Sequence, residues 1–487
     1  MIVGEPLYLA LLALVALAVN LLPGSAPRPA LLLLCSYAYY STFSFQHLPI
    51  LLAVTAIAFG GGLLSARFSQ SGSAGRLTLA AIALCLCPLF VYKYLLPLFL
   101  TSARTGANWQ LTTEDLTVPI GLSFYTFAAI GYLTDVGLGI IPAERSIIRV
   151  ALFCGFFPIV TAGPIPRTSI LPQLDFKRPF TCDRATTALA EILTGTVMKF
   201  WIADTLGATS SAVFADLAHS APLEQFIAAM IFAFQLYADF AGYSLVAIGS
   251  ARLLGVDLPP NFRQPFLAAT IPEFWRRWHI SLLSWLRDYV YVPLTFSWRR
   301  RPRLASAAAT FTVLLLVGIW HGAGWGFLVF GAVHGIAMVY AMTLAMRDRV
   351  WTWLKIPVSV VQAVRVPITF LVVALTLILI RARDVREALG IYQIIFSGRM
   401  VDNLRNVFDP HPDPTLAFRH ITPILLGMDF ALVAILICGD LFARSTWLDF
   451  RKLPRLVRAA FYAACVIIII CQASSATGTK PFLYWQF

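Results

Sequence analysis

The sequence predicts an all-α integral membrane protein that crosses the bilayer many times. Of its 487 residues, 59% are hydrophobic and only 13% are charged. That charged share is about half the roughly 25% of an average soluble protein. Many apolar stretches also approach a length of about 20 residues, which a membrane-spanning helix needs. We therefore expect a polytopic protein with roughly 11 transmembrane helices, accompanied by re-entrant or interfacial helices.

The candidate spans follow one another along the whole chain. The clearest apolar stretches are 7–23, 47–66, 77–100, 188–207, 366–382, 423–443 and 459–474. Two longer stretches, 226–255 and 305–346, have room for more than one crossing or for a broken helix. The first stretch has no preceding basic region of the kind that a signal peptide carries, so we expect it to be retained. Since no soluble domain or repeat separates the stretches, residues 1–487 are predicted to form a single membrane-embedded domain.

The net charge of +13 does not indicate nucleic-acid binding, because the basic residues stand mostly between the apolar stretches. They cluster at 299–303, 347–349 and 452–458, and an excess of Lys and Arg is typical of cytoplasmic loops. The cluster at 381–386 fits this orientation poorly, because one span separates it from the cluster at 347–349. Membrane lipids are the expected surroundings of the chain.

A helix is predicted to begin at Thr270, and it carries the first of two histidines with a candidate role. Thr270 and Glu273 stand three residues apart, which is the spacing of a capping box. Helical spacing of the following apolar residues predicts one amphipathic helix with His279 on its apolar side. Arg276 and Arg277 are then possible contacts for anionic substrate groups. The alternative is a membrane-surface helix, in which the arginines meet headgroups and His279 is a buried hydrogen-bonding residue.

The second histidine stands in the string GIWHGAG at residues 318–324, inside the apolar stretch 305–346. Ionisable side chains are costly in hydrocarbon and usually line a protein interior or a water-filled cavity. We therefore predict a functional role for His321, with Trp320 as a possible substrate contact. The adjacent glycines break a helix or admit another backbone. His334, thirteen residues later, is expected to pack at a helix–helix contact.

These histidines suit proton transfer. A neutral imidazole accepts a proton from a hydroxyl group near neutral pH, and a low-dielectric cavity favours the neutral ring. No HExxH motif, CxxC pair or nucleophile elbow accompanies them, so we expect no bound metal ion or cofactor, and the eight cysteines are expected to be small buried hydrophobes. Asp239, inside another apolar stretch, is a further possible substrate contact. A proton-coupled polysaccharide or lipid transporter remains an alternative, because histidine and aspartate in spans also relay protons.

Five motifs stand in order along almost the whole chain. They are PIGLSFYTFAAIGYLTD at 119–135, GFFPIVTAGPIPRTSILPQL at 155–174, a long segment at 236–294, GIWHGAGWGFLVFGAVHG at 318–335 and the terminal PFLYWQF. Together they resemble the membrane-bound O-acyltransferase family, in particular its bacterial alginate O-acetyltransferase group. A lone WHG motif is a weak signal, whereas five ordered motifs are specific.

The resemblance implies that His321 is the catalytic residue at the base of a central funnel through a ring of helices, and that His279 is a second catalytic residue. It implies an O-acyltransferase that takes an acyl group, commonly acetyl from acetyl-CoA, from a cytoplasmic thioester. The implied acceptor is an exported polysaccharide, reached with a periplasmic acetyltransferase-type partner, and the implied location is the cell inner membrane. The alternative enzyme transfers D-alanine from a carrier-protein thioester to a teichoic-acid-like polymer.

The aromatic ending of the chain leads to a further hypothesis. Tyr484 approaches the reaction chamber and accepts the acyl group transiently, with His321 as the base that activates its phenol. The alternative is that the four aromatic residues of 482–487 form an interfacial belt. The chain also departs from the resembling group at Leu245, where an acidic residue is common, and at 295–298. Both departures weaken the assignment of alginate as the acceptor.

Overall fold

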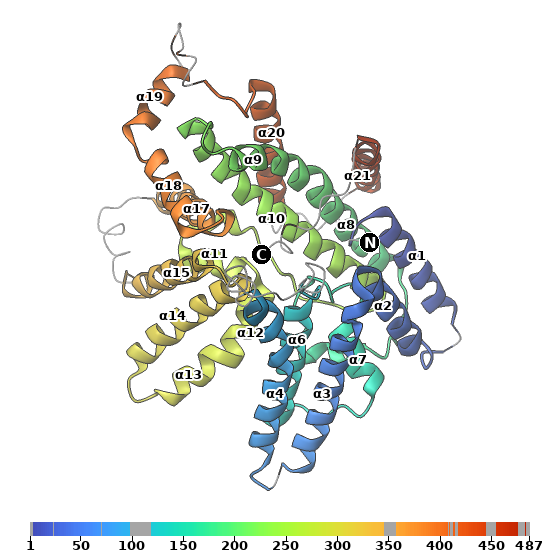
Figure 1. The fold of residues 1–487 in the computed structure, drawn as a ribbon. Coiled ribbons are helices and arrows are strands. Elements are labelled where there is room, and N and C mark those ends of the chain that lie inside the picture. The colour runs from blue at the N-terminus through green and yellow to red at the C-terminus, as the bar shows by residue number, and fades with distance from the viewer. Residues whose placement is uncertain are drawn as a thin grey trace, which may run out of the picture. The chain divides into compact units, whose positions relative to one another are not determined.

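The computed structural model describes residues 3–22, 24–69, 71–97, 118–344, 357–407, 409, 413, 417–444, 454–475 and 483. Within these residues all regular elements are helices (Figure 1). Seven of the described helices are long and apolar enough to cross a membrane: Phe45–Arg67, Ala74–Leu95, Pro222–Leu253, Pro302–His321, Trp325–Met342, Ser359–Arg381 and Pro423–Ala443. The predicted class of an all-α, polytopic membrane protein is confirmed, and the larger predicted number of spans stays a prediction.

The chain packs into two compact units. Unit 1 contains Met1–Gly195, Tyr243–Asn261 and Ser284–Tyr289, and unit 2 contains Thr196–Gly242, Phe262–Leu283 and Val290–Phe487. The boundary cuts through a continuous helix, α10 (Pro222–Leu253), which contributes residues to both units. Such a division describes packing, and the prediction of a single membrane-embedded domain stays a prediction.

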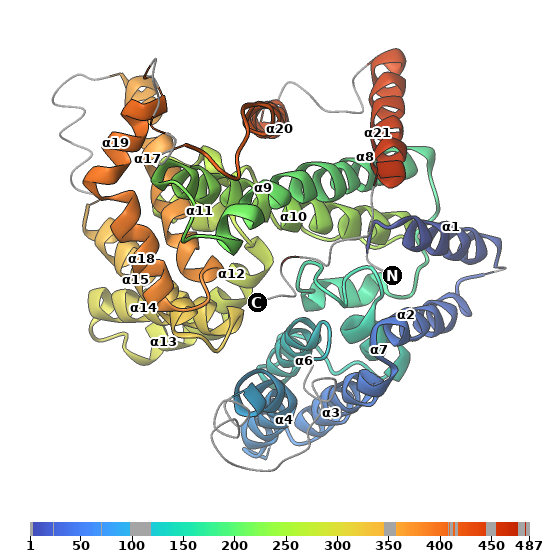
Figure 2. The same cartoon turned by 45° about the horizontal axis from the view of Figure 1, so that its top comes forward.

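Unit 1 is built mainly from seven α-helices of the N-terminal part. They are α1 (Pro6–Leu21), α2 (Arg28–Ser44), α3 (Leu48–Arg67), α4 (Ala74–Phe90), α6 (Leu122–Gly137), α7 (Ile147–Gly155) and α8 (Cys182–Val197). Figures 1 and 2 show α3, α4 and α6 side by side, in agreement with their many contacts. Two glycines of α3 permit this approach, because a Cβ at Gly61 would lie 2.6 Å from Ala81 and one at Gly62 would lie 2.8 Å from Tyr132.

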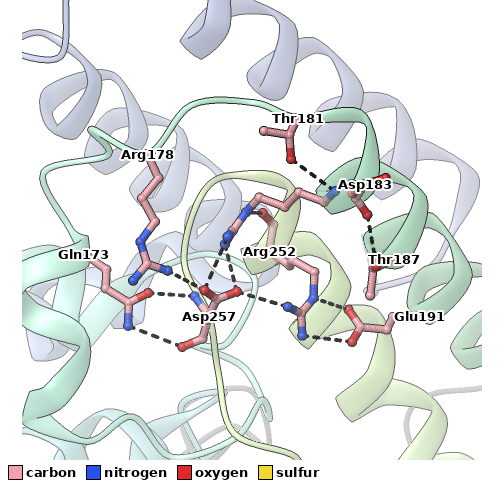
Figure 3. Close-up of polar contacts among 9 residues, drawn as sticks. Gln173, Arg178, Thr181, Asp183, Thr187, Glu191, Arg252 and Asp257 are labelled. Carbon is pink, nitrogen blue, oxygen red and sulfur yellow. Dashed lines mark hydrogen bonds and ion pairs between the residues drawn. The ribbon is translucent and has the colours of Figure 1, made fainter. Parts of the chain in front are cut away.

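An ion-pair network holds the end of α10 in unit 1 (Figure 3). Three arginines converge on the carboxylate of Asp257, namely Arg178, Arg184 at 2.9 Å and Arg252 at 3.1 Å. Arg252 also pairs with both carboxylate oxygens of Glu191, at 2.8 and 3.0 Å. Bidentate pairs of this kind combine charge with fixed geometry. The network therefore ties α8, the end of α10 and the loop at Arg178 together.

Unit 2 contains the remaining α-helices. They are α9 (Asp204–Ala215), α11 (Ile271–Arg277), α13 (Val292–Ser297), α14 (Pro302–His321), α15 (Trp325–Leu344), α17 (Val358–Arg381), α18 (Val385–Ile395), α19 (Gly398–Val407), α20 (Pro423–Arg444) and α21 (Arg455–Ser475), together with the first parts of α10 and of α12 (Ile280–Leu286). The stretch 305–346 forms two candidate spans, as its length suggests, whereas 226–255 belongs to one unbroken helix. The stretch 188–207 runs through α8, the π-helix η4 (Met198–Ala203) and α9, which do not meet the span criteria.

Helices α14 and α15 form a hairpin that packs through glycines. A Cβ at Gly318 would lie 2.2 Å from the backbone oxygen of Phe327, and one at Gly331 would lie 2.6 Å from that of Leu314. Small residues at such positions let two backbones approach closely, which is how helices associate in the absence of a hydrophobic driving force. The glycines around His321 thus serve close approach, as the sequence predicts.

In the basic cluster at 381–386, which fits the predicted orientation poorly, the first residue contacts other side chains of the protein. Arg381 ends α17, and its guanidinium lies 4.8 Å from the ring centre of Phe214 and 5.9 Å from that of Phe232. A cation over aromatic faces is stabilised inside the protein. Arg381 therefore does not need a lipid headgroup, and its position gives no information on which side of the membrane this helix ends.

Candidate functional site

His279 lies between two helices rather than on one. The predicted cap at Thr270 is confirmed: its hydroxyl accepts the N–H of Glu273 at 3.3 Å, and the Glu273 carboxylate accepts the N–H of Ala269 at 2.8 Å. The predicted continuous amphipathic helix is wrong, because α11 ends at Arg277 and α12 (Ile280–Leu286) begins after His279. The backbone at Trp278 is extended. Periodicity alone did not reveal this two-residue break.

The backbone of His279 adopts the left-handed conformation, with φ of 45°. Non-glycine residues seldom occupy this region, and they cost about 1–3 kcal/mol where they do. The surroundings that hold it are aromatic: the ring centre of His279 is 4.7 Å from that of Phe240 and 5.4 Å from that of Trp320. The side chain is 2% exposed. Packing thus fixes a strained residue, which is a frequent property of functional positions.

His321 is the last residue of α14, and it is less buried than His279. The helix ends there because Gly322 is extended, and a Cβ at Gly322 would lie 2.4 Å from the ring of Phe327. The predicted interruption after His321 is therefore confirmed. His321 is thus a half-buried residue at a helix end, not one in the middle of a continuous span.

Trp320 joins the two histidines. Its ring centre lies 5.4 Å from that of His279 and 5.1 Å from that of His321. The structure therefore brings together in unit 2 the two predicted histidines, which are 42 residues apart in sequence, and Trp320. Burial and the nearby His321 lower the pKa of His279 well below its ordinary value. His279 is thus neutral at physiological pH and suited to hydrogen bonding rather than to carrying charge.

His334 has a structural environment. The indole N–H of Trp275 donates to His334 Nδ1 at 3.2 Å, and His334 Nε2 lies 2.8 Å from Thr376 Oγ1. The Thr376 hydroxyl already donates to the carbonyl of Val373 at 2.8 Å, so the proton between them sits on Nε2. Both ring nitrogens are therefore used in a neutral tautomer, which agrees with the predicted packing role.

The two arginines beside His279 have different surroundings. Arg277 pairs with Glu273 and donates to the carbonyl of Gln264 at 3.2 Å, so it is used in holding α11. Arg276 is exposed. Of the pair, Arg276 alone presents its guanidinium to the surroundings, and its contact with an anionic group stays a prediction.

Asp239 is part of a buried ion cluster that the sequence did not reveal. Lys199 Nζ lies 2.7 Å from Asp239 Oδ1 and 3.0 Å from Asp204 Oδ1. The other oxygen of Asp239, Oδ2, accepts the backbone N–H of Leu483 at 3.0 Å. A lysine inside the apolar stretch 188–207 was the available signal, because such a charge needs a partner. The neighbouring Tyr484 lies outside the described residues, so its predicted role stays a prediction.

Three of the ordered motifs also meet inside unit 1. Asp135, at the end of the first motif, accepts hydrogen bonds from Tyr289 at 2.8 Å and from Thr168 of the second motif. The guanidinium of Arg167 lies 4.6 Å from the ring centre of Tyr289. These motif residues therefore have a shared packing role. Among the described residues, no group of three or more His, Cys, Asp or Glu is arranged to hold a metal ion.

Comparison with known proteins identifies a matching family and several relatives. The MBOAT, membrane-bound O-acyltransferase family model matches residues 142–379, a range that includes both histidines. The probable alginate O-acetylase AlgI of Pseudomonas aeruginosa is 33% identical, over 82% of this chain and 75% of that protein. A peptidoglycan O-acetyltransferase of Helicobacter pylori is 29% identical, over 74% and 72% respectively. A teichoic acid D-alanyltransferase of Bacillus subtilis is 26% identical, over 59% and 73%.

Proposed function

Because this chain belongs to the membrane-bound O-acyltransferase family, we propose that it carries an acetyl group from a cytoplasmic thioester to hydroxyl groups of an exported polysaccharide. The chain is an O-acyltransferase and a multi-pass membrane protein. The proposal adds the donor, which is acetyl-CoA or another acyl thioester, and the location, which is the cell inner membrane. It also adds a periplasmic acetyltransferase-type partner that completes delivery to the polymer.

The observation that carries the proposal is the pair of histidines joined by Trp320. His321 is the last residue of α14 and is half-buried, while His279 is buried and its ring centre lies 5.4 Å from that of Trp320. Acyl transfer to a hydroxyl needs one base that reaches the substrate and one group that holds the geometry. The exposure of His321 suits the first task, and the fixed position of His279 suits the second.

In the proposed reaction, His321 removes the proton of the acceptor hydroxyl as its oxygen attacks the thioester carbonyl. The tetrahedral intermediate then collapses, the carbon–sulfur bond breaks, and the protonated His321 returns its proton to the thiolate. The new ester and the free thiol leave, and the enzyme is unchanged. His279 orients the reacting groups by hydrogen bonding, and Trp320 contributes an apolar wall. General-base catalysis of this kind contributes about 10²–10⁴-fold to a rate.

In a second version of the proposed reaction, Tyr484 carries the acyl group between the donor and the acceptor. Its phenol accepts the acyl group in a first transfer and passes it to the acceptor hydroxyl in a second, with His321 as the base in both. The contact of Leu483 with Asp239 supports this form. Leu483 directly precedes Tyr484, and Asp239 directly precedes Phe240, whose ring packs on that of His279.

The acceptor class follows from the names of the relatives. They specify alginate, peptidoglycan and teichoic acid, and either acetyl or D-alanyl groups. A polymer with hydroxyl groups is common to all three, which favours a polysaccharide acceptor here. D-Alanyl transfer from a carrier-protein thioester is the second candidate, and the match to a D-alanyltransferase favours it. A transporter gains no support from these relatives.

Thioester turnover by purified protein tests the proposal. We expect release of free thiol from acetyl-CoA in the presence of an acceptor, and a fall of about 10²–10⁴-fold in kcat for His321→Ala. The matched control is His219→Ala, because His219 is exposed and pairs with Asp216. Turnover that survives His321→Ala in folded protein would remove His321 from the mechanism. Turnover with D-alanyl-carrier thioester but not with acetyl-CoA would select the second candidate.

A further inference from the structure

The buried cluster around Lys199 is unusual for its charge. Lys199 is 1% exposed and Asp239 is 2% exposed. Burying a lysine and a carboxylate is costly unless they pair and their remaining polar atoms find partners. Lys199 satisfies Oδ1 of Asp239 at 2.7 Å, which leaves Oδ2 as an acceptor. That oxygen takes the backbone N–H of Leu483, 244 residues away in sequence.

The donor to Oδ2 of Asp239 is a backbone N–H group, so the contact depends on a position along the chain rather than on a side-chain type. A backbone N–H is present at almost any residue, so the bond does not select leucine. It fixes which position of the C-terminal segment lies at Asp239. A hydrogen bond to a charged acceptor is also stronger than a neutral one, and Asp239 is paired with Lys199.

Both residues of the contact have sequence neighbours in or beside the candidate site. Asp239 directly precedes Phe240 on α10, and the ring centre of Phe240 lies 4.7 Å from that of His279. The ring of Trp320 in turn contacts the rings of both His279 and His321. Tyr484 directly follows Leu483 in the sequence.

We propose that Lys199 and Asp239 are positioning residues that dock the C-terminal segment at Leu483 and set the register in which it serves acyl transfer. This inference rests on the proposed function. Asp239 is accordingly a docking residue for the chain's own backbone, rather than a contact for substrate. Lys199 acts through Asp239, and neither side chain takes part in bond formation.

The test uses the full-length protein and a neutral double variant, Lys199→Met with Asp239→Leu. Replacing Lys199 and Asp239 together leaves neither of these two buried residues as a lone ion. Asp204 loses its contact with Lys199, but its side chain is 17% exposed and keeps contact with its surroundings, so the thermal midpoint is expected to stay near that of the wild type. Carboxypeptidase digestion followed by intact-mass measurement reports docking directly. We expect Leu483 to be retained in the wild type and removed at least about tenfold faster in the double variant, as for a segment released from its contacts.

Turnover separates positioning from simple stability. We expect kcat of the double variant to fall by about 100-fold, the effect of misplacing a reacting group, with KM for acetyl-CoA unchanged. Insertion of one glycine between Leu483 and Tyr484 should keep Leu483 protected and still lower kcat. The control is Asp257→Asn, which breaks an ion-pair network among residues of unit 1. It should leave both the protection of Leu483 and kcat unchanged.

Equal protection of Leu483 in the wild type and the double variant would overturn the docking. Released Leu483 with an unchanged kcat, or an unchanged kcat after the insertion, would overturn the positioning role. Absence of thioester turnover in the wild type would instead sink the proposed function. The digestion would in that case still decide whether the docking point exists.

Discussion

At the scale of the residue, burial of His279 among aromatic rings affects both its backbone conformation and its protonation state. Its left-handed backbone is held by Phe240 and Trp320, and its ring is kept neutral by burial. His321 has the opposite character, since it ends a helix and is partly exposed. The two histidines of one cluster therefore have different surroundings, which suit the separate tasks that we propose for them: His279 holds geometry, and His321 reaches the substrate.

The burial of His279 predicts a dependence of stability on pH. The pKa of His279 is lowered in the folded state, while that of an unfolded histidine is about 6.5. Below pH about 6.5 the unfolded chain gains a proton that the folded chain does not, so stability is lost as the pH falls, by about 1.4 kcal/mol per pH unit. Above pH about 6.5 the contribution of the neutral His279 to stability is fully present.

The matching variant is His279→Asn, because asparagine tolerates the left-handed conformation and does not titrate. Thermal unfolding in detergent at pH 7 and at pH 5 should show a smaller loss of midpoint for the variant than for the wild type. Equal losses in the two proteins would contradict the assignment of a buried, neutral histidine.

At the scale of the element, the α14–α15 hairpin determines where His321 lies. Close approach of the two backbones requires glycine at Gly318 and Gly331, because a Cβ at either position would overlap backbone atoms of the partner helix. Gly318 is three residues before His321. A change in the spacing of the hairpin therefore moves the histidine as well.

Gly318→Ala is expected to destabilise the protein by about 1–3 kcal/mol, since the added methyl group would lie 2.2 Å from a backbone oxygen. Gly390→Ala is the matched control, because a Cβ at Gly390 in α18 meets nothing within 4 Å. There we expect no loss, or a gain of up to about 1 kcal/mol from helix propensity. Thermal midpoints check both, and similar midpoints for the two variants would count against glycine-mediated packing.

At the scale of the whole molecule, the two units are stabilised by different kinds of polar contact. Unit 1 uses a partly exposed network in which three arginines share Asp257. Unit 2 uses the buried cluster of Lys199, Asp239 and Asp204. Screening by salt weakens exposed ion pairs much more than buried ones, so the two units should respond differently to ionic strength.

Asp257→Asn should lower stability by about 1–2 kcal/mol, because it leaves three arginines around a neutral amide and the site is partly screened. The difference from the wild type should shrink as salt is added. Thermal midpoints at low and high ionic strength provide the measurement. A difference that does not depend on salt would show that the network acts through packing rather than charge.

Much of the site could be predicted from the sequence, for identifiable reasons. A histidine among glycines in an apolar stretch identified His321, and the capping spacing identified the start of α11 at Thr270. The break at His279 was missed, because a two-residue interruption hardly changes helical periodicity. The pairing of Lys199 with Asp239 does not show in the sequence, because the two residues are 40 positions apart and only folding brings them together.

The sequence by itself determined the class of this protein, its family resemblance and the choice of His279 and His321 as candidate site residues. These follow from composition, stretch length and motif order, which are properties of neighbouring residues. Only the tertiary structure decided the left-handed turn at His279, the Trp320 bridge between the histidines, and the contact of Asp239 with Leu483. Each of these depends on contacts between residues 39 or more positions apart, and distant pairing is set by packing rather than by local pattern.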